Sequence, residues 1–478
     1  MFQVPLDWAN PDGEKISLAV RERAHTSAAS QGLLLVNPGG PGASGTGLAD
    51  FIASQIPNSV GHQYDVVGWD PRGVGASTPS LHCNSHYFGV NRPNFKPSTH
   101  RLMRYWKKKT SRYAAQCGAS TASRLLGHMS TLDNVKDMEA LRIALGGPAA
   151  KLNFYGFSYG SYLGQVYATR NPGKVDKFVL DGVVDPSNYW YGANLQQEIG
   201  FDRNLNVFFR WVAKHNRAYH LGTSKKAIRR GFNALLKRLD RHPAFHRKLG
   251  PDELTDAMLN AGYYVYDWDG IAAAYSRLVR KGNGRGMFRM YADANLGDDN
   301  GYAVYLGVQC TDVRPPAWST QVKDARRINR KHPFLAWDNT WFNAPCVSWP
   351  AAAVGGLGVN GAATAALGGK VLLVNETKDA ATPYSGALRV RSLFPSSALI
   401  AGVGGTTHAG SLSGVSCVDS RIATFLADGV LPPRQPGTRA DVNCPKVPPP
   451  APTRYARTTG GGRPAALQDL LARAQMVG

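Results

Sequence analysis

A serine in a predicted sharp turn is the first residue of this sequence that could do covalent chemistry. Residues 156–160, Gly-Phe-Ser-Tyr-Gly, match G-x-S-x-G and lie between a predicted strand at 152–155 and a helix that begins just after Ser158. In that context the pattern forms a nucleophile elbow, whose small residues permit the turn and leave the serine oxygen exposed above the sheet. We therefore predict Ser158 as a nucleophile. The alternative is an ordinary serine in a glycine-rich turn.

A nucleophilic serine requires a base, and the base requires an acid that orients it. When the serine occupies an elbow of this kind, the order along the chain is Ser, then Asp or Glu, then His. Asp379 follows a predicted strand at 370–374, and His408, the only histidine after position 340, follows the next strand at 398–400. We predict Asp379 as the acid and His408 as the base, with Glu376 as the competing acid.

Acyl transfer also requires hydrogen-bond donors for the oxyanion of the intermediate. We expect one donor to be the backbone N–H of Tyr159, directly after the nucleophile. The second should come from the glycine-rich loop Asn-Pro-Gly-Gly-Pro-Gly at 37–42, and Gly40 is favoured. A Rossmann phosphate loop is the weaker interpretation, because the G-x-G-x-x-G spacing is missing.

The elements around these residues alternate between short apolar runs and helical patterns. A helix is expected over 131–146, with Ser130 as its N-cap. Alternation of this kind predicts a mostly parallel sheet with helices on both faces. The apolar runs predict buried strands at 33–36, 64–69, 152–155, 177–180, 370–374 and 398–400.

The alternation stops after about residue 190, where the sequence becomes helical in pattern and rich in Trp, Tyr, Lys and Arg. We interpret this stretch as a helical cap inserted into one α/β domain. The predicted organisation is the first part of the core at 1–190, the cap at 191–340, the second part of the core at 341–450, and a proline-rich flexible tail with a short terminal helix at 451–478.

Composition excludes several classes of protein. Hydrophobic residues make up 43% of the 478 positions, which excludes a wholly disordered chain. No run approaches ~18 consecutive apolar residues, so no membrane-spanning helix is expected. The first residues, Met-Phe-Gln-Val-Pro, lack a basic start followed by an apolar run, so we expect no signal peptide in this chain.

The net charge of +22 favours acidic partners or anionic surfaces. The recognition motifs of DNA- and RNA-binding domains are missing, so no specific nucleic acid is expected. An anionic cell-wall surface is the partner that this charge would fit. The densest basic cluster, which we interpret as a solvated helix face, comprises Arg101, Arg104, Lys107, Lys108, Lys109 and Arg112.

Six cysteines occur, and none forms the C-x-x-C pair of a zinc site or a thioredoxin-like motif. Their positions fall into three separate pairs, which favours sequential disulfides that each close a loop of roughly 30–40 residues. Disulfides indicate an oxidising compartment, and six free thiols in a cytosolic protein are the alternative. The favoured pairs are Cys83–Cys117, Cys310–Cys346 and Cys417–Cys444.

Together these motifs resemble one known family, the secreted tripeptidyl aminopeptidases of actinobacteria, in the prolyl-iminopeptidase-like branch of the α/β-hydrolases. The resemblance spans roughly 1–450, and 370–445 is similar to the family's TAP-like C-terminal region. The motifs that carry it are Asn-Pro-Gly-Gly-Pro-Gly-Ala-Ser-Gly at 37–45, Asp-Pro-Arg-Gly-Val-Gly at 70–75, Gly-Phe-Ser-Tyr-Gly-Ser-Tyr at 156–162, Leu-Asp-Gly-Val-Val-Asp-Pro at 180–186 and Gly-Gly-Thr-Thr-His-Ala-Gly at 404–410.

The resemblance implies an α/β-hydrolase fold with an inserted helical cap. It implies a serine exopeptidase that removes tripeptides or similar short peptides from a free N-terminus, with Ser158, Asp379 and His408 as its triad and with no metal or cofactor. It also implies a secreted or cell-wall-associated enzyme. Two features depart from the family: the export signal is absent, and the net charge is high, which would shift the substrate range toward acidic peptides.

Two other functions remain open at this point. The same triad could serve an esterase or a small-molecule amide hydrolase, and the basic surface could serve a non-catalytic protein that binds a polyanion. An aminopeptidase also needs a carboxylate that faces the cleft and binds the protonated α-amine. The candidates in the predicted cap, for each of which a surface salt bridge is the alternative, are Glu198, Asp202, Asp267, Asp269 and Asp312.

Aromatic residues of the predicted cap could line a pocket for a proline or an apolar side chain. Packing in the core of the cap is the alternative for each of them. The residues concerned are Tyr263, Tyr264, Tyr266 and Trp268.

Overall fold

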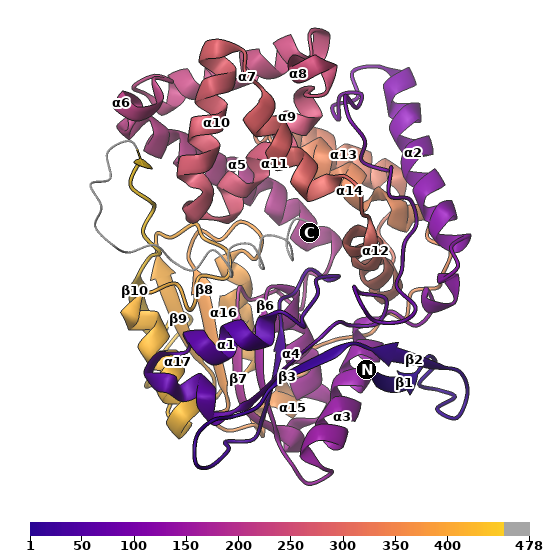
Figure 1. Cartoon of the computed structure of the whole chain (residues 1–478), viewed down its shortest axis with the longest axis vertical. Helices are drawn as coiled ribbons and strands as arrows, with labels where there is room; N and C mark the ends of the chain where they lie inside the picture. Colours follow the sequence, from indigo (N-terminus) through magenta and orange to yellow (C-terminus); the bar gives the residue numbers. More distant parts are fainter. Residues whose placement is uncertain (454–478) are drawn as a thin grey trace.

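The computed structural model describes residues 1–453 (Figure 1). The predicted tail, with its short terminal helix, therefore lies outside the described residues from 454 onward. Within residues 1–453, no helix has both the length and the apolar character that crossing a membrane would need.

An eight-stranded sheet forms the lower part of the molecule in Figure 1, in the order β10-β9-β8-β7-β6-β4-β5-β3. Neighbouring strands are parallel except β3, which runs antiparallel to β5. The mostly parallel sheet is thus confirmed. The six predicted strands are all present, as β4 (Leu33–Asn37), β5 (Asp65–Trp69), β6 (Leu152–Phe157), β7 (Val175–Asp181), β8 (Val371–Glu376) and β9 (Ala398–Val403).

Four short strands were not predicted. They are β1 (Phe2–Pro5) and β2 (Lys15–Leu18), which pair with each other, and the two edge strands β3 (Val20–Arg23) and β10 (Val442–Pro445). Each has only four residues, and β3 is Val-Arg-Glu-Arg. Short, polar edge strands are common in native sheets and leave little hydrophobic pattern in a sequence.

Helices cover both faces of the sheet. One face packs against α1 (Leu48–Gln55) and α17 (Ser416–Asp428). The other packs against α3 (Thr131–Gly146), α4 (Tyr159–Arg170) and α16 (Tyr384–Leu393). Successive side chains of β4 enter opposite cores and all five are buried, which explains why its sequence reads as a continuous apolar run.

The region predicted as the cap contains helices and, within the described chain, no strand. In Figure 1 these helices lie above the sheet. They are α5 (Tyr191–Lys214), α6 (Asn216–Tyr219), α7 (Lys225–Arg241), α8 (Ala244–Arg247), α9 (Pro251–Tyr263), α10 (Trp268–Lys281), α11 (Arg285–Asn295), α12 (Asn300–Asp312), α13 (Trp318–Asn329) and α14 (Ala336–Asn343).

Shorter elements complete the described chain. The helix α15 (Gly361–Ala365) precedes β8. The 3₁₀ segments are η1 (Pro57–Gln63), η2 (Ser123–Leu125), η3 (Pro172–Lys174), η4 (Val265–Asp267) and η5 (Ala344–Ser348).

The helix that carries the basic cluster, α2 (His100–Gly118), packs on the cap side of the molecule. Trp106 stacks on Trp341 of α14, with ring centroids 5.9 Å apart. Lys107 lies over the ring of Trp318, and Lys109 lies over Tyr87. The basic face of α2 is therefore partly used in packing. The predicted domain boundaries, which gave this helix to the core, stay a prediction.

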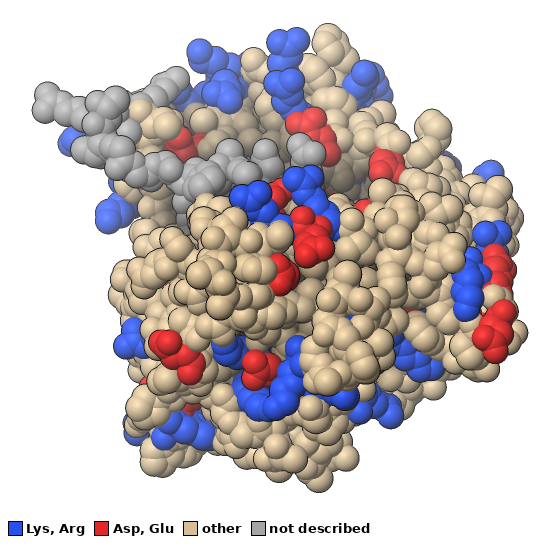
Figure 2. All heavy atoms as spheres, turned by 60° about the horizontal axis from the view of Figure 1, so that its bottom comes forward, with Lys and Arg blue, Asp and Glu red and all other residues tan. Residues whose placement is uncertain are grey.

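Acidic side chains interrupt the positive charge on one face of the molecule. On the face presented in Figure 2, Lys and Arg side chains occur in several places, and several of them lie beside Asp or Glu.

The three disulfides join the cysteines in the sequential order that the sequence favoured. Cys83–Cys117 ties the end of α2 to the segment that precedes it, Cys310–Cys346 ties α12 to η5, and Cys417–Cys444 ties α17 to β10. Each disulfide therefore covalently links two neighbouring segments of the fold.

We predict that replacing both Cys417 and Cys444 by serine lowers the free energy of unfolding by about 3 kcal/mol, because a cross-link over a loop of this length restricts the unfolded chain. The two residues are 27 positions apart. Urea denaturation followed by circular dichroism measures the change. Equal stability of the variant and the parent protein would mean that this disulfide does not form in solution.

Candidate active site

Ser158 occupies a strained turn between β6 and α4. Its φ is 55° and its ψ is −122°, an unusual backbone conformation for a residue other than glycine. A Cβ atom on Gly156 would lie 2.4 Å from the carbonyl oxygen of Gly160, and one on Gly160 would lie 2.8 Å from that of Asn37. Both glycines of the motif are therefore required for the turn to close.

His408 and Asp379 meet directly. Nδ1 of His408 lies 2.7 Å from Oδ2 of Asp379, and both side chains are buried. The other oxygen, Oδ1, accepts hydrogen bonds from the backbone N–H groups of Ala381 and Thr382, and the Thr382 hydroxyl donates to Oδ2. The carboxylate is thus held in one orientation beneath the imidazole. The sequence analysis did not single out Thr382, which follows the acid by three residues.

Glu376, the competing acid, lies in a different environment. Its two oxygens accept hydrogen bonds from the backbone N–H groups of Thr407 and Val447, at 2.6 and 2.7 Å. Burial raises the pKa of Glu376 to about 8, although these hydrogen bonds act in the opposite direction. Glu376 therefore holds the loop that leads into His408, while Asp379 is the acid that contacts the imidazole.

Ser158 and His408 both contact the turn that follows β7. The backbone N–H of Ser158 donates to the carbonyl of Asp181 at 2.8 Å. The next residue, Gly182, lies against the imidazole, because a Cβ there would be 2.9 Å from Cε1 of His408. Nε2 of His408 is buried and has no hydrogen-bond partner within residues 1–453. The ring nitrogen that could accept a proton is therefore uncommitted.

The predicted oxyanion donors belong to the same cavity as Ser158, which Gly40 and Tyr159 both line. Gly39 and Gly40 have φ values of +99° and +103°, and a Cβ on Gly39 would lie 2.9 Å from Cβ of Ser158. The loop backbone thus passes directly beside the serine. Tyr159 is the first residue of α4, where backbone N–H groups lack partners within the helix.

The cavity at Ser158 lies between the sheet and the helices above it. Its walls include Asn194 and Gln197 of α5 and Trp190, which directly precedes that helix. Tyr263 of α9 and residues of α12 complete the walls on the cap side. A second cavity shares Trp190, Asn194 and Gln309 with it, and a third shares Gln197 and Tyr263. The three spaces are therefore neighbours with common walls, and together they are called the cleft below.

Of the four aromatic residues considered as pocket walls, Tyr263 lines the cleft. The other three line none of the three cavities and pack within the cap. Trp268, for example, is buried against Phe208 and Trp211. Core packing is thus the role of most of this aromatic group.

Four of the five candidate carboxylates line none of these three cavities. Asp202 pairs with Arg229 at 2.7 Å. Asp269 accepts a hydrogen bond from the Tyr219 hydroxyl, and Asp267 lies half-buried in η4. These three acids are therefore not among the residues that line the three cavities.

Asp312 is also committed to the protein itself. Its carboxylate accepts the backbone N–H and the hydroxyl of Thr131 and the indole N–H of Trp190. Burial raises the pKa of Asp312 to about 7. Asp312 therefore supports Trp190, a wall of the cleft, from behind.

Glu198 differs from the other four. It lines the second cavity, its residue surface is 1% exposed, and its Oε2 has no hydrogen-bond partner within the described chain. Burial, with a smaller effect from Asp324, raises the pKa of Glu198 well above its ordinary value, and Arg327 opposes this shift. A buried carboxylate of this kind is stabilised in its charged form by a cation that enters the cavity.

The third cavity contains a carboxyl pair that the sequence analysis missed. Asp256 and Asp338 both line it and hydrogen-bond to each other, and Arg92 lies 2.6 Å from Asp256. Burial raises the pKa of both acids. They come from α9 and α14, so nothing local in the sequence relates them.

Comparison with known proteins agrees with this geometry. The family model described as "alpha/beta hydrolase fold" matches residues 32–406, which is most of the chain. The chain belongs to the α/β-hydrolase family.

Related sequences refine this assignment. A tripeptidyl aminopeptidase of Streptomyces coelicolor is 36% identical over 92% of this chain and 82% of its own length. The serine protease Hip1 of Mycobacterium tuberculosis is 29% identical over 90% of this chain and 85% of its own, and carboxylesterase B of the same organism is 31% identical over 90% and 84%. The resemblance predicted from the motifs is confirmed. The chain is a serine hydrolase, and the first two relatives support a peptidase.

Solved structures show only low similarity to this chain. Proline iminopeptidase of Mycobacterium smegmatis is 14% identical, with 89% of this chain and 97% of that chain covered and a TM-score of 0.36. The assignment of this enzyme therefore rests on the family model and the related sequences.

We predict that Gly156→Ala destabilises the enzyme by about 1–3 kcal/mol or more, because the new methyl group would overlap the Gly160 carbonyl in a closely packed turn. The matched control is Gly231→Ala in α7, where a Cβ has no neighbour within 4 Å. That change should be neutral or stabilising by up to about 1 kcal/mol. Urea denaturation of both variants measures the difference, and equal stabilities would contradict the described elbow.

Proposed function

We propose that this enzyme is a serine exopeptidase that releases tripeptides or similar short peptides from free N-termini. The observation that carries the proposal is Glu198, a buried carboxylate in a cavity that shares the walls Trp190, Asn194 and Gln309 with the cavity at Ser158. A carboxylate in this position fits the protonated α-amine of a peptide whose scissile bond lies at Ser158. Two related proteins named tripeptidyl aminopeptidase support the same substrate class.

In the proposed first half-reaction, the Ser158 hydroxyl oxygen attacks the carbonyl carbon of the scissile peptide bond. Its proton passes to Nε2 of His408, and Asp379, 2.7 Å from Nδ1, stabilises the resulting imidazolium. The carbonyl oxygen becomes an oxyanion, for which the backbone N–H groups of Tyr159 and Gly40 are the proposed donors. The uncommitted Nε2 of His408 is the atom that this step needs.

Collapse of the tetrahedral intermediate breaks the C–N bond. The imidazolium returns its proton to the leaving amine, which becomes the new N-terminus of the shortened peptide. The N-terminal segment of the substrate remains bound to Ser158 as an ester. Water then attacks this ester with His408 as base, and a free carboxylate and the serine hydroxyl are regenerated.

Recognition of the amine explains why cleavage would be confined to chain ends. An ammonium group that meets Glu198 gives this buried carboxylate a partner of opposite charge, whereas an acetylated N-terminus offers no charge. Because Glu198 lies in the second cavity rather than beside Ser158, room remains for residues between the amine and the scissile bond. This separation favours release of a short peptide over release of a single amino acid.

An esterase or small-molecule amide hydrolase is the second candidate. The observation in its favour is the relative named carboxylesterase B, at 31% identity over most of both chains. In that enzyme the same serine, histidine and aspartate would hydrolyse an ester or a small amide. Such an enzyme would have no need for a buried carboxylate in the cleft, which is why we prefer the exopeptidase.

We also propose that the enzyme works outside the cell. Three disulfides are consistent with an oxidising compartment, where such bonds persist. The net charge of +22 would favour contact with an anionic cell wall and with acidic peptides.

A matched substrate pair tests the function. We predict that Ala-Pro-Ala-p-nitroanilide with a free N-terminus is hydrolysed and that its acetylated form is not. Ser158→Ala, which removes the nucleophile, should abolish this activity and exclude a contaminating peptidase. Equal cleavage of both forms would indicate an endopeptidase or general amidase, and cleavage of short acyl esters alone would indicate the esterase.

The same pair tests Glu198. We expect Glu198→Gln to lower kcat/KM for the free-amine substrate by about 30-fold or more, since loss of one partner of a buried charge pair costs about 2–5 kcal/mol. The effect should appear mainly in KM. The control, Asp269→Asn, changes another acid of the cap and should leave kcat/KM unchanged. Full activity of Glu198→Gln, with loss in Asp338→Asn, would place amine recognition in the third cavity instead.

Two carboxyl variants separate the roles of the acids near His408. We predict that Asp379→Asn lowers kcat by about 10⁴-fold, because the amide would favour the wrong tautomer of the imidazole. Glu376→Gln should lower kcat far less than Asp379→Asn, because Glu376 bonds to backbone N–H groups of the neighbouring loops and not to the imidazole. Steady-state kinetics on the free-amine substrate measure both, and the reverse order of effects would make Glu376 the acid.

A further inference from the structure

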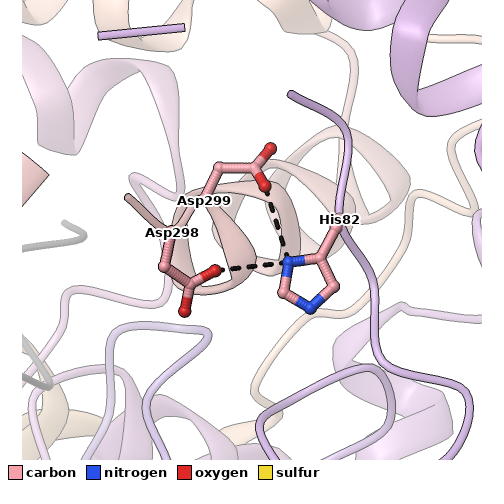
Figure 3. Close-up of side chains that lie close together, drawn as sticks. All are labelled: His82, Asp298 and Asp299. Atoms are coloured by element: carbon pink, nitrogen blue, oxygen red, sulfur yellow. Dashed lines mark ion pairs between the residues drawn. The ribbon is translucent and has the colours of Figure 1, made fainter. Parts of the chain in front are cut away.

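Three side chains outside the catalytic cleft converge at the start of α12. His82 comes from the segment that precedes Cys83, and Asp298 and Asp299 directly precede the helix. Nδ1 of His82 lies 3.2 Å from Oδ1 of Asp298 and 3.6 Å from Oδ1 of Asp299. Figure 3 shows both carboxylates turned toward the same ring nitrogen.

Asp299 is the buried member of this group, with a side chain that is 1% exposed. Its Oδ2 accepts hydrogen bonds from the backbone N–H groups of Cys83 and Asn84 and from the hydroxyl of Tyr113. Its Oδ1 has no hydrogen-bond partner within residues 1–453 and faces His82. A buried carboxylate oxygen without a donor is costly unless a cation neutralises it.

The other nitrogen of His82 is also oriented. Nε2 lies 3.2 Å from the hydroxyl of Ser80, and that hydroxyl lies 3.0 Å from the side-chain amide of Asn300. When the proton is on Nε2, this N–H donates a hydrogen bond to the Ser80 hydroxyl. The lone pair of Nδ1 then points at the two carboxylates. Histidines that bind metals are commonly held in this way, by a hydrogen bond from the ring nitrogen that does not bind the metal.

The separations fit a shared ion better than a direct hydrogen bond. The hydrogen-bonded pairs His25–Asp65 and His408–Asp379 measure 2.7 Å, and the looser ion pairs His128–Asp7 and His332–Asp202 measure 3.8 Å. Ligand atoms about 2.0–2.1 Å from a tetrahedral metal ion lie about 3.3 Å from one another. The 3.2 and 3.6 Å separations at His82 bracket that value.

We infer that His82, Asp298 and Asp299 bind a divalent transition-metal ion such as Zn²⁺. An imidazole nitrogen among the donors favours this class over Ca²⁺ and Mg²⁺, which prefer oxygen ligands alone. Two carboxylates balance the charge of the divalent ion. The side chains of His82 and Asp298 are 54% and 70% exposed, which leaves room for water as a further ligand.

The ion would have a structural role. The ion would join the segment that the Cys83–Cys117 disulfide attaches to α2 with the residues that directly precede α12. Tyr305 and Gln309 of α12 line the catalytic cleft. Binding would therefore stabilise one wall of the cleft, and no step of hydrolysis would pass through the ion.

The test uses the full chain, treated with a chelator and dialysed, with ZnCl₂ as the probe. Isothermal titration calorimetry should give one saturable site, and the melting temperature should rise by a few degrees with added Zn²⁺ because the ion binds only the folded state. His82→Ala and Asp298→Asn should each abolish both effects. The matched control is His86→Ala, which removes another exposed histidine four residues away and should retain both.

Two outcomes would overturn the inference. Absence of saturable binding to the parent protein at Zn²⁺ concentrations up to about 1 mM would mean that the three side chains interact only with one another. Equal binding by the parent protein and His82→Ala would place the ion elsewhere. Circular dichroism of each variant establishes that it is folded, and anomalous diffraction at the zinc edge locates the ion independently.

Discussion

The backbone of Ser158, with a φ of 55°, is held in a strained turn by close packing around it. The glycines on both sides, Gly156 and Gly160, have no room for a side chain. Such a conformation costs about 1–3 kcal/mol and persists only where its surroundings enforce it. Here β6 is buried along its whole length, and the glycines at 156 and 160 bring the strand, the helix α4 and the loop at Asn37 within van der Waals contact. The direction of α4 and the position of the Gly39–Gly40 loop follow from this one turn.

Carboxyl groups around the cleft are chemically alike, and their hydrogen-bond partners separate them. Asp379 accepts from two backbone N–H groups, a hydroxyl and an imidazole, so its charge is balanced within the protein. Glu376 is also bonded, yet burial dominates and raises its pKa to about 8. Glu198 is buried with an oxygen that has no donor. Because burial favours the neutral form and donors favour the charged form, Glu198 is the one of these three acids whose charged form depends on a partner from outside.

The sequence predicted those features that depend on adjacent residues or on the order of the catalytic residues along the chain. The elbow needs only five adjacent residues, and Asp379 and His408 follow from the rule of order. Glu198 could not be separated from Asp202, Asp267, Asp269 and Asp312, because the difference between them lies in contacts with distant helices. The pairing of Asp256 with Asp338, and the packing of α2 beside α14, likewise depend on tertiary contacts. The edge strands escaped prediction because four residues carry too little pattern.

The helix α12 connects these features, because both of its ends are fixed to the sheet side of the molecule. At its start, the Asn300 side chain bonds to Gly73, Gly75 and Leu81, and at its end Asp312 holds Thr131 and Trp190. Between them, Tyr305 and Gln309 line the cleft. A wall anchored at both ends by buried polar contacts keeps the cleft at one width, so the groups that meet a substrate are positioned before it arrives. The length of peptide accepted would then depend on where Glu198 lies along the cleft rather than on movement of the cap.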